Sequence, residues 1–120
     1  MATILVVEDI PANLALATKL LRAAGHQVLG SATGQDGIDL AREHHPDVVL
    51  LDLGLPDMSG WDALREIRSS DGGAAVRVVA FTADAMVGDR ERVMEAGFDG
   101  YLSKPLDFAT FANSVEAYLR

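Results

Sequence analysis

Cysteine is absent from all 120 residues of the chain. Disulfide bonds, thiolate metal sites and cysteine nucleophiles are therefore excluded, which suits a reducing compartment. The sequence also has no apolar run of membrane-spanning length, and no basic segment followed by an apolar signal core. We expect a soluble, cytoplasmic protein that does not associate with a membrane.

Basic residues are few. Ten Lys and Arg stand against 18 Asp and Glu, so the net charge is −8 and the isoelectric point is near 4.6. The ten basic residues are scattered along the chain rather than gathered in a stripe. Because a surface that binds the nucleic-acid backbone needs clustered Lys and Arg, we expect no nucleic-acid binding by this chain.

The apolar pattern predicts one α/β domain over residues 1–120. A chain of this length can bury a hydrophobic core without disulfides or a structural metal. Short apolar runs of strand type alternate with amphipathic helical patterns, and they fall at 4–7, 28–29, 48–51, 78–81 and 101–102. Such alternation is typical of βαβ units around a parallel sheet. We predict a doubly wound (βα)5 three-layer sandwich of five strands and five helices, with strand order 2-1-3-4-5.

The first three helices have recognisable start or stop signals. Pro11 is favoured at a first helical position, and Gly25 ends the first helix. His26 follows in the turn, where we expect it to be exposed. Thr33 is the expected N-cap of the second helix, with an acid three residues later, and Ser59 is the expected N-cap of the third.

The last two helices have weaker patterns. The fourth, predicted at 85–96, is rich in charge and short of large apolar residues, so we expect it to be the most weakly held. Its expected anchors are Val87, Val93 and Met94. The fifth is predicted to begin after Asp107 as cap. The apolar stripe expected on this helix comprises Phe108, Phe111, Val115, Tyr118 and Leu119.

The clearest single feature is a buried strand that ends in an acid. Residues 48–51 are all aliphatic, Asp52 follows, and Gly54 and Pro56 come directly after it. A short aliphatic run bounded by turn residues is typical of a strand buried on both faces of a parallel sheet. Taken alone, Asp52 would be interpreted as an ordinary turn cap, since Asp is common in turns.

Polar residues at the ends of other strands change that balance. Glu8 and Asp9 follow the first strand, Thr82 ends the fourth, and Lys104 with Pro105 follows the fifth. In a sheet of order 2-1-3-4-5, the carboxyl ends of strands 1, 3, 4 and 5 line one crevice. The second strand ends in nothing reactive. The sequence therefore favours a functional site at this crevice over a set of unrelated turn residues.

The chemistry of these groups points to phosphoryl transfer. Clustered carboxylates from Glu8, Asp9 and Asp52 repel one another unless a cation intervenes, and a hard ion such as Mg²⁺ suits such oxygen ligands. With the metal bound, ionised Asp52 can act as a nucleophile towards a phosphoryl group. Lys104 can neutralise charge on the transferring oxygens, and Thr82 can donate a hydrogen bond to them.

Four ordered motifs resemble the signature of response-regulator receiver domains, the CheY-like family with a flavodoxin-like fold. These motifs are Val7-Glu8-Asp9, Leu51-Asp52-Leu53-Gly54-Leu55-Pro56-Asp57-Met58-Ser59-Gly60, Phe81-Thr82-Ala83 and Ser103-Lys104-Pro105. The resemblance covers essentially the whole chain. A further segment, 82–86, together with Gly88-Asp89, Gly97 and Tyr101, resembles stand-alone regulators of the DivK kind and receivers of hybrid histidine kinases.

The resemblance implies a role for each matching residue. Asp52 would be the phosphoacceptor, charged by a histidine kinase or a histidine phosphotransfer protein. Glu8 and Asp9 would hold Mg²⁺ (or Mn²⁺), with Asp52 and the backbone carbonyl of Gly54 completing the protein ligands. Thr82 would be the switch hydroxyl and Tyr101 the switch aromatic. Lys104 would pair with the phosphoryl group, and the Lys104–Pro105 peptide would be cis.

Phosphorylation of such a domain implies a change in the face built from the fourth helix, fifth strand and fifth helix, which would alter affinity for a downstream effector protein. The expected protein is a signalling switch rather than a metabolic enzyme. It would be a monomer, with phosphorylation-dependent dimerisation as an alternative. Four positions vary from common relatives. Glu8 is a longer acid than the usual Asp, and Ser59 stands where Asp is frequent, which should affect helix capping more than chemistry. Gly54 and Asp84 flank the pocket and are expected to modulate the lifetime of the phosphoryl group.

Other readings remain open at this point. A haloacid-dehalogenase-type hydrolase also uses an aspartyl phosphate, but that chemistry needs a second acid where Gly54 stands. A nucleotide or flavin binder on the same architecture lacks its usual glycine pattern after the first strand. A phosphorylation-independent adaptor of the same fold is a third alternative. The same residues would also fit a receiver cut from a hybrid histidine kinase.

Overall fold

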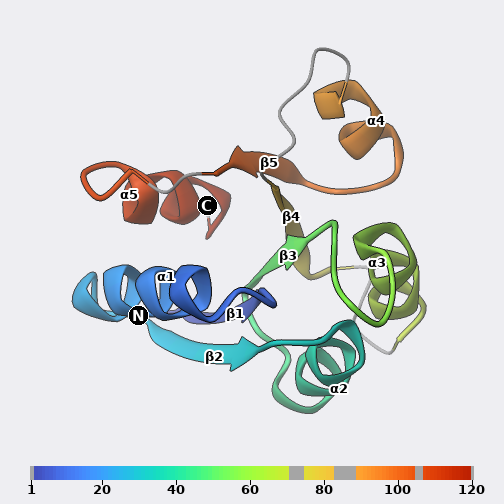
Figure 1. The fold of residues 1–120 in the computed structure, drawn as a ribbon, viewed down its shortest axis with the longest axis horizontal. Helices are drawn as coiled ribbons and strands as arrows, with labels where there is room; N and C mark the ends of the chain where they lie inside the picture. The colour runs from blue at the N-terminus through green and yellow to red at the C-terminus, as the bar shows by residue number, and fades with distance from the viewer. Residues whose placement is uncertain (1, 71–74, 83–88, 105–106, 120) are drawn as a thin grey trace.

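A computed structural model describes residues 2–70, 75–82, 89–104 and 107–119. Within these residues, strands and helices alternate from the N-terminus to the C-terminus (Figure 1). Their bounds are β1 (Thr3–Val7), α1 (Pro11–Ala23), β2 (Gln27–Ser31), α2 (Gly34–His44), β3 (Val48–Asp52), α3 (Gly60–Ser69), β4 (Arg77–Thr82), α4 (Asp89–Glu95), β5 (Gly100–Ser103), α5 (Phe111–Glu116) and the short 3₁₀ helix η1 (Ala117–Leu119).

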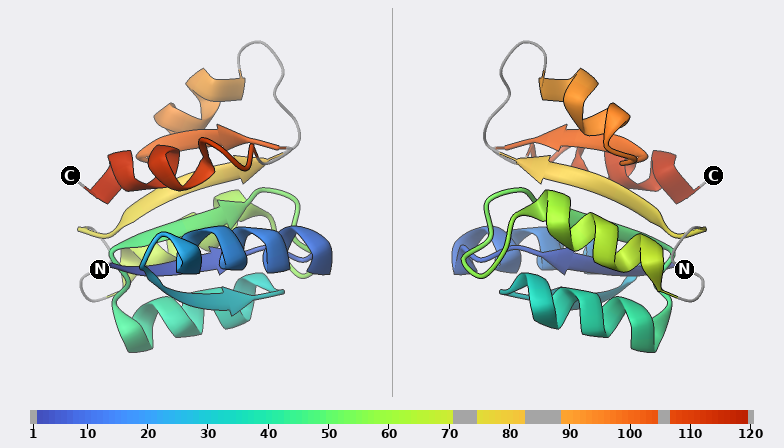
Figure 2. Two further views of the ribbon diagram at one scale, coloured as in Figure 1. Left: turned by 90° about the vertical axis from the view of Figure 1, so that its left-hand side faces the viewer. Right: turned by 90° about the vertical axis from the view of Figure 1, so that its right-hand side faces the viewer.

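The strands form one parallel sheet in the order β2-β1-β3-β4-β5. Figure 2 shows α1 and α5 in front of the sheet from one side, and α2, α3 and α4 in front of it from the other. This is the doubly wound three-layer arrangement that the sequence predicts, and the strand order is confirmed. Among the described residues, no helix has the length and apolar character needed to cross a bilayer.

Alternating side chains of the strands supply two separate apolar cores. In β1, Leu5 and Val7 face the core beneath α2, α3 and α4, whereas Ile4 and Val6 face the core beneath α1 and α5. The same alternation runs through β3 and β4. All five residues of β3 are buried, so the prediction of a strand covered on both faces is confirmed.

The predicted signals of α1, α2 and α3 appear where the sequence places them, whereas α5 begins at Phe111 rather than directly after Asp107. Pro11 occupies the first turn of α1, and Gly25 adopts a φ of 94° just after it. The Thr33 hydroxyl accepts the N–H of Asp36 at 3.2 Å, and the Ser59 hydroxyl accepts the N–H of Asp62 at 3.1 Å. Both caps satisfy backbone donors that have no partner inside the helix.

The two C-terminal helices differ from the prediction. In α4, Val93 is buried as expected, but Met94 is 46% exposed and the prediction that it anchors the helix is wrong. The expected anchor Val87 lies outside the described residues. Phe108 is 70% exposed, so its place in the apolar stripe is also wrong. The reason is local: the Asp107 carboxylate accepts the Ala109 N–H at 2.9 Å, which forms a turn before α5 begins.

His26 is a further correction. Its side chain is only 9% exposed, although the turn after α1 predicts an exposed position. Its Nδ1 accepts the Ala2 N–H at 3.2 Å, and its Nε2 lies 2.9 Å from Glu116 Oε1. Since Nδ1 is an acceptor, Nε2 carries the hydrogen and donates it to the carboxylate. His26 thereby ties the start of β1 to the end of α5.

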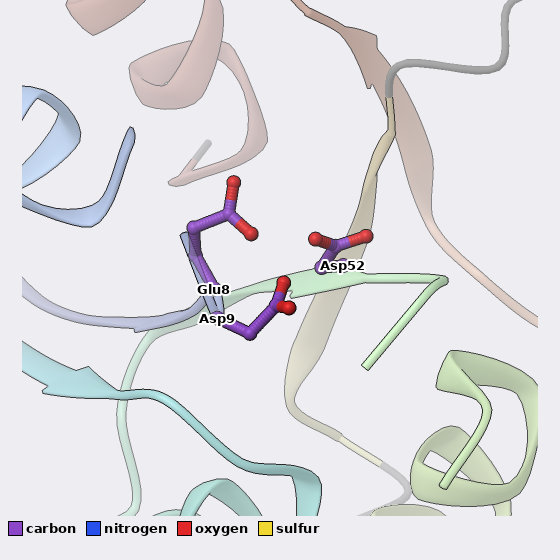
Figure 3. Close-up of side chains that lie close together, drawn as sticks. All are labelled: Glu8, Asp9 and Asp52. Carbon is purple, nitrogen blue, oxygen red and sulfur yellow. The ribbon is translucent and has the colours of Figure 1, made fainter. Parts of the chain in front are cut away.

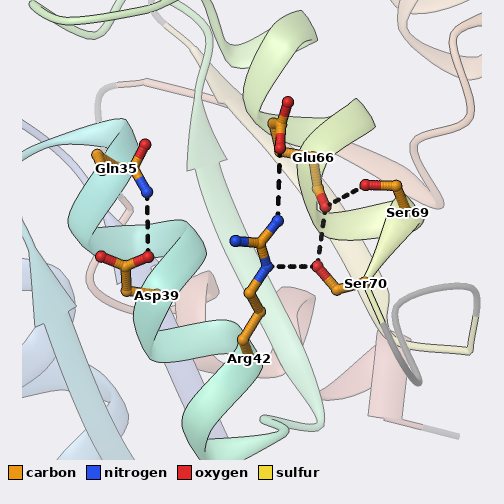
Figure 4. A network of polar contacts seen from close by, with 6 residues as sticks. All are labelled: Gln35, Asp39, Arg42, Glu66, Ser69 and Ser70. Atoms are coloured by element: carbon orange, nitrogen blue, oxygen red, sulfur yellow. Dashed lines mark hydrogen bonds and ion pairs between the residues drawn. The ribbon is translucent and has the colours of Figure 1, made fainter.

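Helices α2 and α3 are joined by a polar network on their outer faces (Figure 4). Arg42 of α2 donates from Nε to Ser70 Oγ at 2.6 Å and pairs with the Glu66 carboxylate at 3.4 Å. The Ser69 and Ser70 hydroxyls both donate to the Glu66 carbonyl, each at 2.9 Å. These bonds lie on exposed surface, where an ion pair adds little stability, so the buried face of each helix supplies most of its attachment.

Candidate functional site

Three carboxylates converge at the carboxyl edge of the sheet (Figure 3). Glu8 and Asp9 follow β1, and Asp52 ends β3. The two strands are paired in register, with Val7 opposite Leu51, so their ends lie side by side. One oxygen from each carboxylate lies within 4.8 Å of the other two. Glu8 is 0% exposed, Asp52 is 7% exposed and Asp9 is half-buried, so two of the three acids in the cluster are buried.

A lysine from the end of β5 completes the cluster. The ammonium of Lys104 lies 3.0 Å from Asp52 Oδ2 and forms an ion pair with Glu8 Oε1. It also lies 4.9 Å from the centre of the Phe81 ring, a cation–π distance. The Lys104 N–H donates to the Thr82 carbonyl at 2.9 Å, which continues the β4–β5 pairing by one residue. The strand register therefore delivers Lys104 to the carboxylates.

Burial and proximity shift the pKa values of these groups in different directions. Burial raises the pKa of Glu8 to about 7, and the neighbouring Asp52 carboxyl adds to the rise while Lys104 opposes it. Burial also raises the pKa of Asp52, but Glu8, the Gly54 N–H and Lys104 together outweigh burial and hold it below its usual range. The pKa of Lys104 is raised, because its two carboxylate partners outweigh the effect of burial.

The donor set fits a hard divalent cation. Three carboxylates face a single lysine, and Glu8 Oε2 is buried with no hydrogen-bond partner among the described residues. A buried oxygen without a donor is costly unless a ligand satisfies it, and carboxylates with few competing donors suit Mg²⁺. Glu8, Asp9 and Asp52 are thus brought together as the sequence predicts for a metal site.

The loop between β3 and α3 shapes the other side of the cluster. The Gly54 N–H donates to Asp52 Oδ1 at 2.9 Å, and Gly54 forms a bridge with Ser59 across the loop. The Gly60 N–H donates to the Leu53 carbonyl at 2.9 Å. A Cβ on Gly60 would lie 2.6 Å from the Asp52 carbonyl oxygen, so glycine is required where α3 begins. Gly54 itself is exposed, which leaves the space beside Asp52 open.

Thr82 and Tyr101 occupy neighbouring strands. Thr82 ends β4 and is buried, at the same edge as Asp52. Tyr101 lies in β5 opposite Ala80, half-buried against the core beneath α2, α3 and α4. The remaining predicted site residues, Asp84 and Pro105, lie outside the described residues, and so does the predicted cis peptide between Lys104 and Pro105.

Two residues near the cluster were not predicted from the sequence. Phe81 contacts the Lys104 ammonium, and nothing in an apolar strand residue indicates a cation partner. Asp57, in the β3–α3 loop, accepts backbone N–H groups from the start of α2. Its position next to Pro56 indicates only a turn.

Comparison with known proteins identifies the family. Residues 4–116 match the family model of the response regulator receiver domain. The chain belongs to this family, whose members are the receiver domains of two-component systems. Its CheY-like fold, its acidic cluster and the four motifs noted in its sequence all agree with that membership.

The chain is similar in sequence to a response regulator and to the receiver domain of a sensor kinase. It is 36% identical over 117 residues to the polar-differentiation response regulator DivK of Brucella ovis, covering 98% of this chain and 95% of the relative. It is also 36% identical to the receiver domain of sensor histidine kinase PA1611 from Pseudomonas aeruginosa PAO1, with a TM-score of 0.89 over 98% of this chain and 97% of the other. That crystal structure has a magnesium ion coordinated in the active site cleft.

Chemotaxis protein CheY4 of Vibrio cholerae has a TM-score of 0.91 over 98% of both chains, at 22% identity. At that identity the likeness concerns the fold alone. The three comparisons together place the chain in the receiver family, with DivK-like sequence relatives and CheY-like structural neighbours.

Proposed function

We propose that this chain is a Mg²⁺-dependent phosphoacceptor in a two-component phosphorelay, with Asp52 as the phosphorylated residue. The observation that carries the proposal is the setting of Asp52. Its carboxylate lies 3.0 Å from the Lys104 ammonium and within 4.8 Å of the Glu8 and Asp9 carboxylates, at the crevice edge of the sheet. An ionised carboxylate next to a cation and a metal-binding acid pair is suited to receive a phosphoryl group.

Glu8, Asp9 and Asp52, with the Gly54 carbonyl, would hold Mg²⁺ or Mn²⁺, which supplies positive charge beside the phosphoryl oxygens. The magnesium ion in the cleft of the similar receiver domain from Pseudomonas aeruginosa supports this assignment. The buried Glu8 oxygen without a hydrogen-bond donor among the described residues supports it independently.

The other residues act on the phosphoryl group or respond to it. The lowered pKa of Asp52 keeps its carboxylate ionised and nucleophilic at neutral pH. Lys104 is released from part of its pairing with Asp52 when the acyl phosphate forms, and it then pairs with a phosphoryl oxygen. Thr82 donates its hydroxyl to another oxygen, and Tyr101 moves inward behind it. Gly54 and Asp84 modulate how readily water reaches the phosphoryl group.

The wider assignment follows from this role. The chain is a single receiver domain over residues 1–120, located in the cytoplasm, and it catalyses only its own phosphorylation and dephosphorylation. A histidine kinase or histidine phosphotransfer protein donates the phosphoryl group. The face formed by α4, β5 and α5 then changes its affinity for an effector protein. The protein is a monomer, and dimerisation on phosphorylation is the alternative that a sizing experiment tests. It binds neither nucleic acid nor membrane.

The deciding experiment is phosphorylation by a small donor. With Mg²⁺ and acetyl phosphate, we expect intact-mass spectrometry to show one added phosphoryl group, and none after Asp52→Asn or in EDTA. Asp39→Asn, which alters an exposed acid on α2 outside the cluster, is the matched control and should still be labelled. Labelling of the Asp52→Asn protein would overturn the proposal.

The same preparation separates the alternatives. Turnover of phosphate esters by the wild-type protein would favour a hydrolase. Effector binding that is unchanged by Asp52→Asn and by acetyl phosphate would favour a phosphorylation-independent adaptor. The proteins that this chain resembles include both a response regulator and the receiver domain of a sensor histidine kinase. The phosphodonor is therefore identified by measuring phosphoryl transfer to the chain from purified kinase domains and from purified phosphotransfer domains.

A further inference from the structure

Asp57 connects the β3–α3 loop to a different element, the N-terminus of α2. Its Oδ1 accepts the Gly34 N–H at 2.8 Å, and its Oδ2 accepts the Gln35 N–H at 3.0 Å. These N–H groups belong to the first turn of α2 and have no partner inside the helix. The two bonds favour the charged form, and they hold the pKa of the Asp57 carboxyl below its usual range.

The contact between loop and helix is close as well as polar. A Cβ built on Gly34 would lie 2.5 Å from Met58 Cγ and 3.3 Å from Asp57 Oδ1. A larger residue at position 34 would therefore displace the Met58 side chain and crowd the Asp57 carboxylate. The cap of α2 itself is a separate bond, in which the Asp36 N–H donates to the Thr33 hydroxyl. Asp57 is thus an additional attachment rather than the cap that α2 needs to begin.

The same start of α2 is also tied to Glu8. The Glu8 N–H donates to the Ser31 carbonyl at 2.9 Å. The Ser31 hydroxyl in turn donates to the Thr33 carbonyl at 2.7 Å and accepts the Thr33 N–H at 3.3 Å. Backbone from both sides of the acidic cluster, one carrying Glu8 and the other Gly54, is therefore fastened to one helix start.

We propose that Asp57 is a positioning residue for the metal site. Through the first turn of α2, it holds the β3–α3 loop so that the Gly54 carbonyl and the Glu8 carboxylate are correctly spaced before an ion binds. This inference rests on the proposed function, because it assigns the purpose of the attachment to Mg²⁺ binding. Preorganised ligands bind an ion more tightly because less of the chain must be ordered on binding.

The test compares Asp57→Ala with Thr33→Ala. Each variant removes side-chain acceptors from the first turn of α2, but only Asp57→Ala releases the loop. Without metal, we expect amide hydrogen exchange at Gly54 and Gly60 to become faster in Asp57→Ala and to stay unchanged in Thr33→Ala. Asp57 is exposed, so the variant should fold. Asp57→Asn, which keeps one acceptor oxygen, should fall between Asp57→Ala and the wild type.

Mg²⁺ titration followed by the NMR signal of the Gly54 amide gives the second readout. We expect Asp57→Ala to bind Mg²⁺ about tenfold more weakly, the lower end of the effect of removing an outer partner of a metal site. The phosphorylation rate at saturating Mg²⁺ should be unchanged, since Asp57 does not touch the reacting atoms. Thr33→Ala should bind Mg²⁺ like the wild type.

The outcomes distinguish the two proposals. If the wild type binds Mg²⁺ and Asp57→Ala binds it equally well, the positioning role is wrong and the proposed function stands. An equal loss of affinity in Thr33→Ala would also overturn it, because the effect would then belong to the stability of α2. If the wild type binds no Mg²⁺, the proposed function fails and the positioning role fails with it.

Discussion

Helices α3 and α4 cover the same face of the sheet but are attached to it very differently. In α3, Ala63, Leu64 and Ile67 are buried, and Ser59 caps its first turn. Near its end, Arg68 donates to the Gly97 carbonyl at 3.1 Å and pairs with Asp99 at 2.8 Å. Among the side chains that the structure describes in α4, Val93 is the buried one, and Met94 is exposed.

The difference indicates which side of the molecule can respond to a charge change at Asp52. The β3–α3 side carries Asp52 and is held by a capped helix with several buried side chains, and the Arg68 bonds join this side to the segment after α4. The α4–β5 side carries Lys104 and, among the residues that the structure describes, has fewer buried side chains. Regions with few buried apolar contacts open at low free-energy cost. We therefore expect the α3 side to hold the nucleophile still and the α4 side to move.

The largest expected loss of stability comes from removing Lys104, whose ammonium joins the α4–β5 side to the acids of the β3–α3 side. Lys104→Met leaves Glu8 and Asp52 buried without their cation, which should cost about 3–5 kcal/mol of unfolding free energy at pH 8 in EDTA. The loss should be smaller at pH 5, where Glu8 is protonated. Urea unfolding at both pH values measures this loss. Lys19→Met, at an exposed position of α1, is the matched control. Equal losses of unfolding free energy in Lys104→Met and Lys19→Met would show that Lys104 does not join the two sides.

Leu64→Ala tests the attachment of α3. Leu64 is 1% exposed, and truncating a buried leucine costs about 3–4 kcal/mol through lost transfer energy and a residual cavity. Because α3 is attached at many points, this loss should appear in the global unfolding transition. A lower urea midpoint with unchanged slope is the expected signature. Faster exchange limited to α3, with no change in midpoint, would contradict it.

Burial of Glu8 makes the stability of the folded protein depend on pH. Its pKa rises from 4.5 to about 7 on folding, so the folded state binds the proton more tightly. The resulting stability is fully present below pH 4.5 and is lost as pH rises through 7, a change of about 3 kcal/mol in metal-free protein. Glu8→Gln should flatten this profile and be the more stable protein at pH 8. Parallel profiles of wild type and variant would contradict the shift.

Val93→Ala should have a smaller and more local effect than Leu64→Ala. Losing two buried methyl groups costs about 2 kcal/mol. Since Val93 is the buried side chain described in α4, we expect much faster amide exchange in α4 and β5 and little change in α3. Exchange measured by mass spectrometry separates these regions. A uniform increase over the whole chain would show that α4 is as firmly attached as α3.

The smallest effect is expected at Met94. Met94→Gln keeps similar helix propensity on an exposed position, so stability should change by less than about 0.5 kcal/mol. Met58→Gln, at the half-buried methionine against Gly34, is the control from the well-held side and should cost about 1 kcal/mol. Thermal unfolding of both variants measures the difference. A larger loss at Met94 would place an unrecognised contact on α4.

The sequence predicted those features that depend on neighbours along the chain. Strand alternation, the Thr33 and Ser59 caps, and the position of the buried strand before Asp52 all follow from local patterns. Phe108 was predicted wrongly because helical periodicity identifies an apolar stripe without showing where the helix starts. Phe108 is exposed because the Ala109 N–H donates to the Asp107 carboxylate, which forms a turn before α5 begins. Met94 was predicted wrongly because its neighbour Val93 takes the buried face of α4, and adjacent residues on a helix point in different directions.

Contacts between distant segments could not be predicted in this way. His26 is buried because Glu116, 90 residues later, meets it. Asp57 has its bond partners at Gly34 and Gln35, more than 20 residues earlier, and nothing local distinguishes it from an ordinary turn acid. Each of these contacts joins a loop or turn to a helix that is distant in the sequence, and only the whole fold brings the two segments together.

The sequence by itself determined the alternation of strands and helices and the acids and lysine that follow particular strands. These depend on period, on turn residues and on residue type, which are local. Tertiary structure alone decided that Lys104 reaches both Glu8 and Asp52, and that Glu8 keeps an oxygen without a donor among the described residues. Parallel pairing brings the strand ends to one edge, and only the folded sheet sets the distances that shift their pKa values.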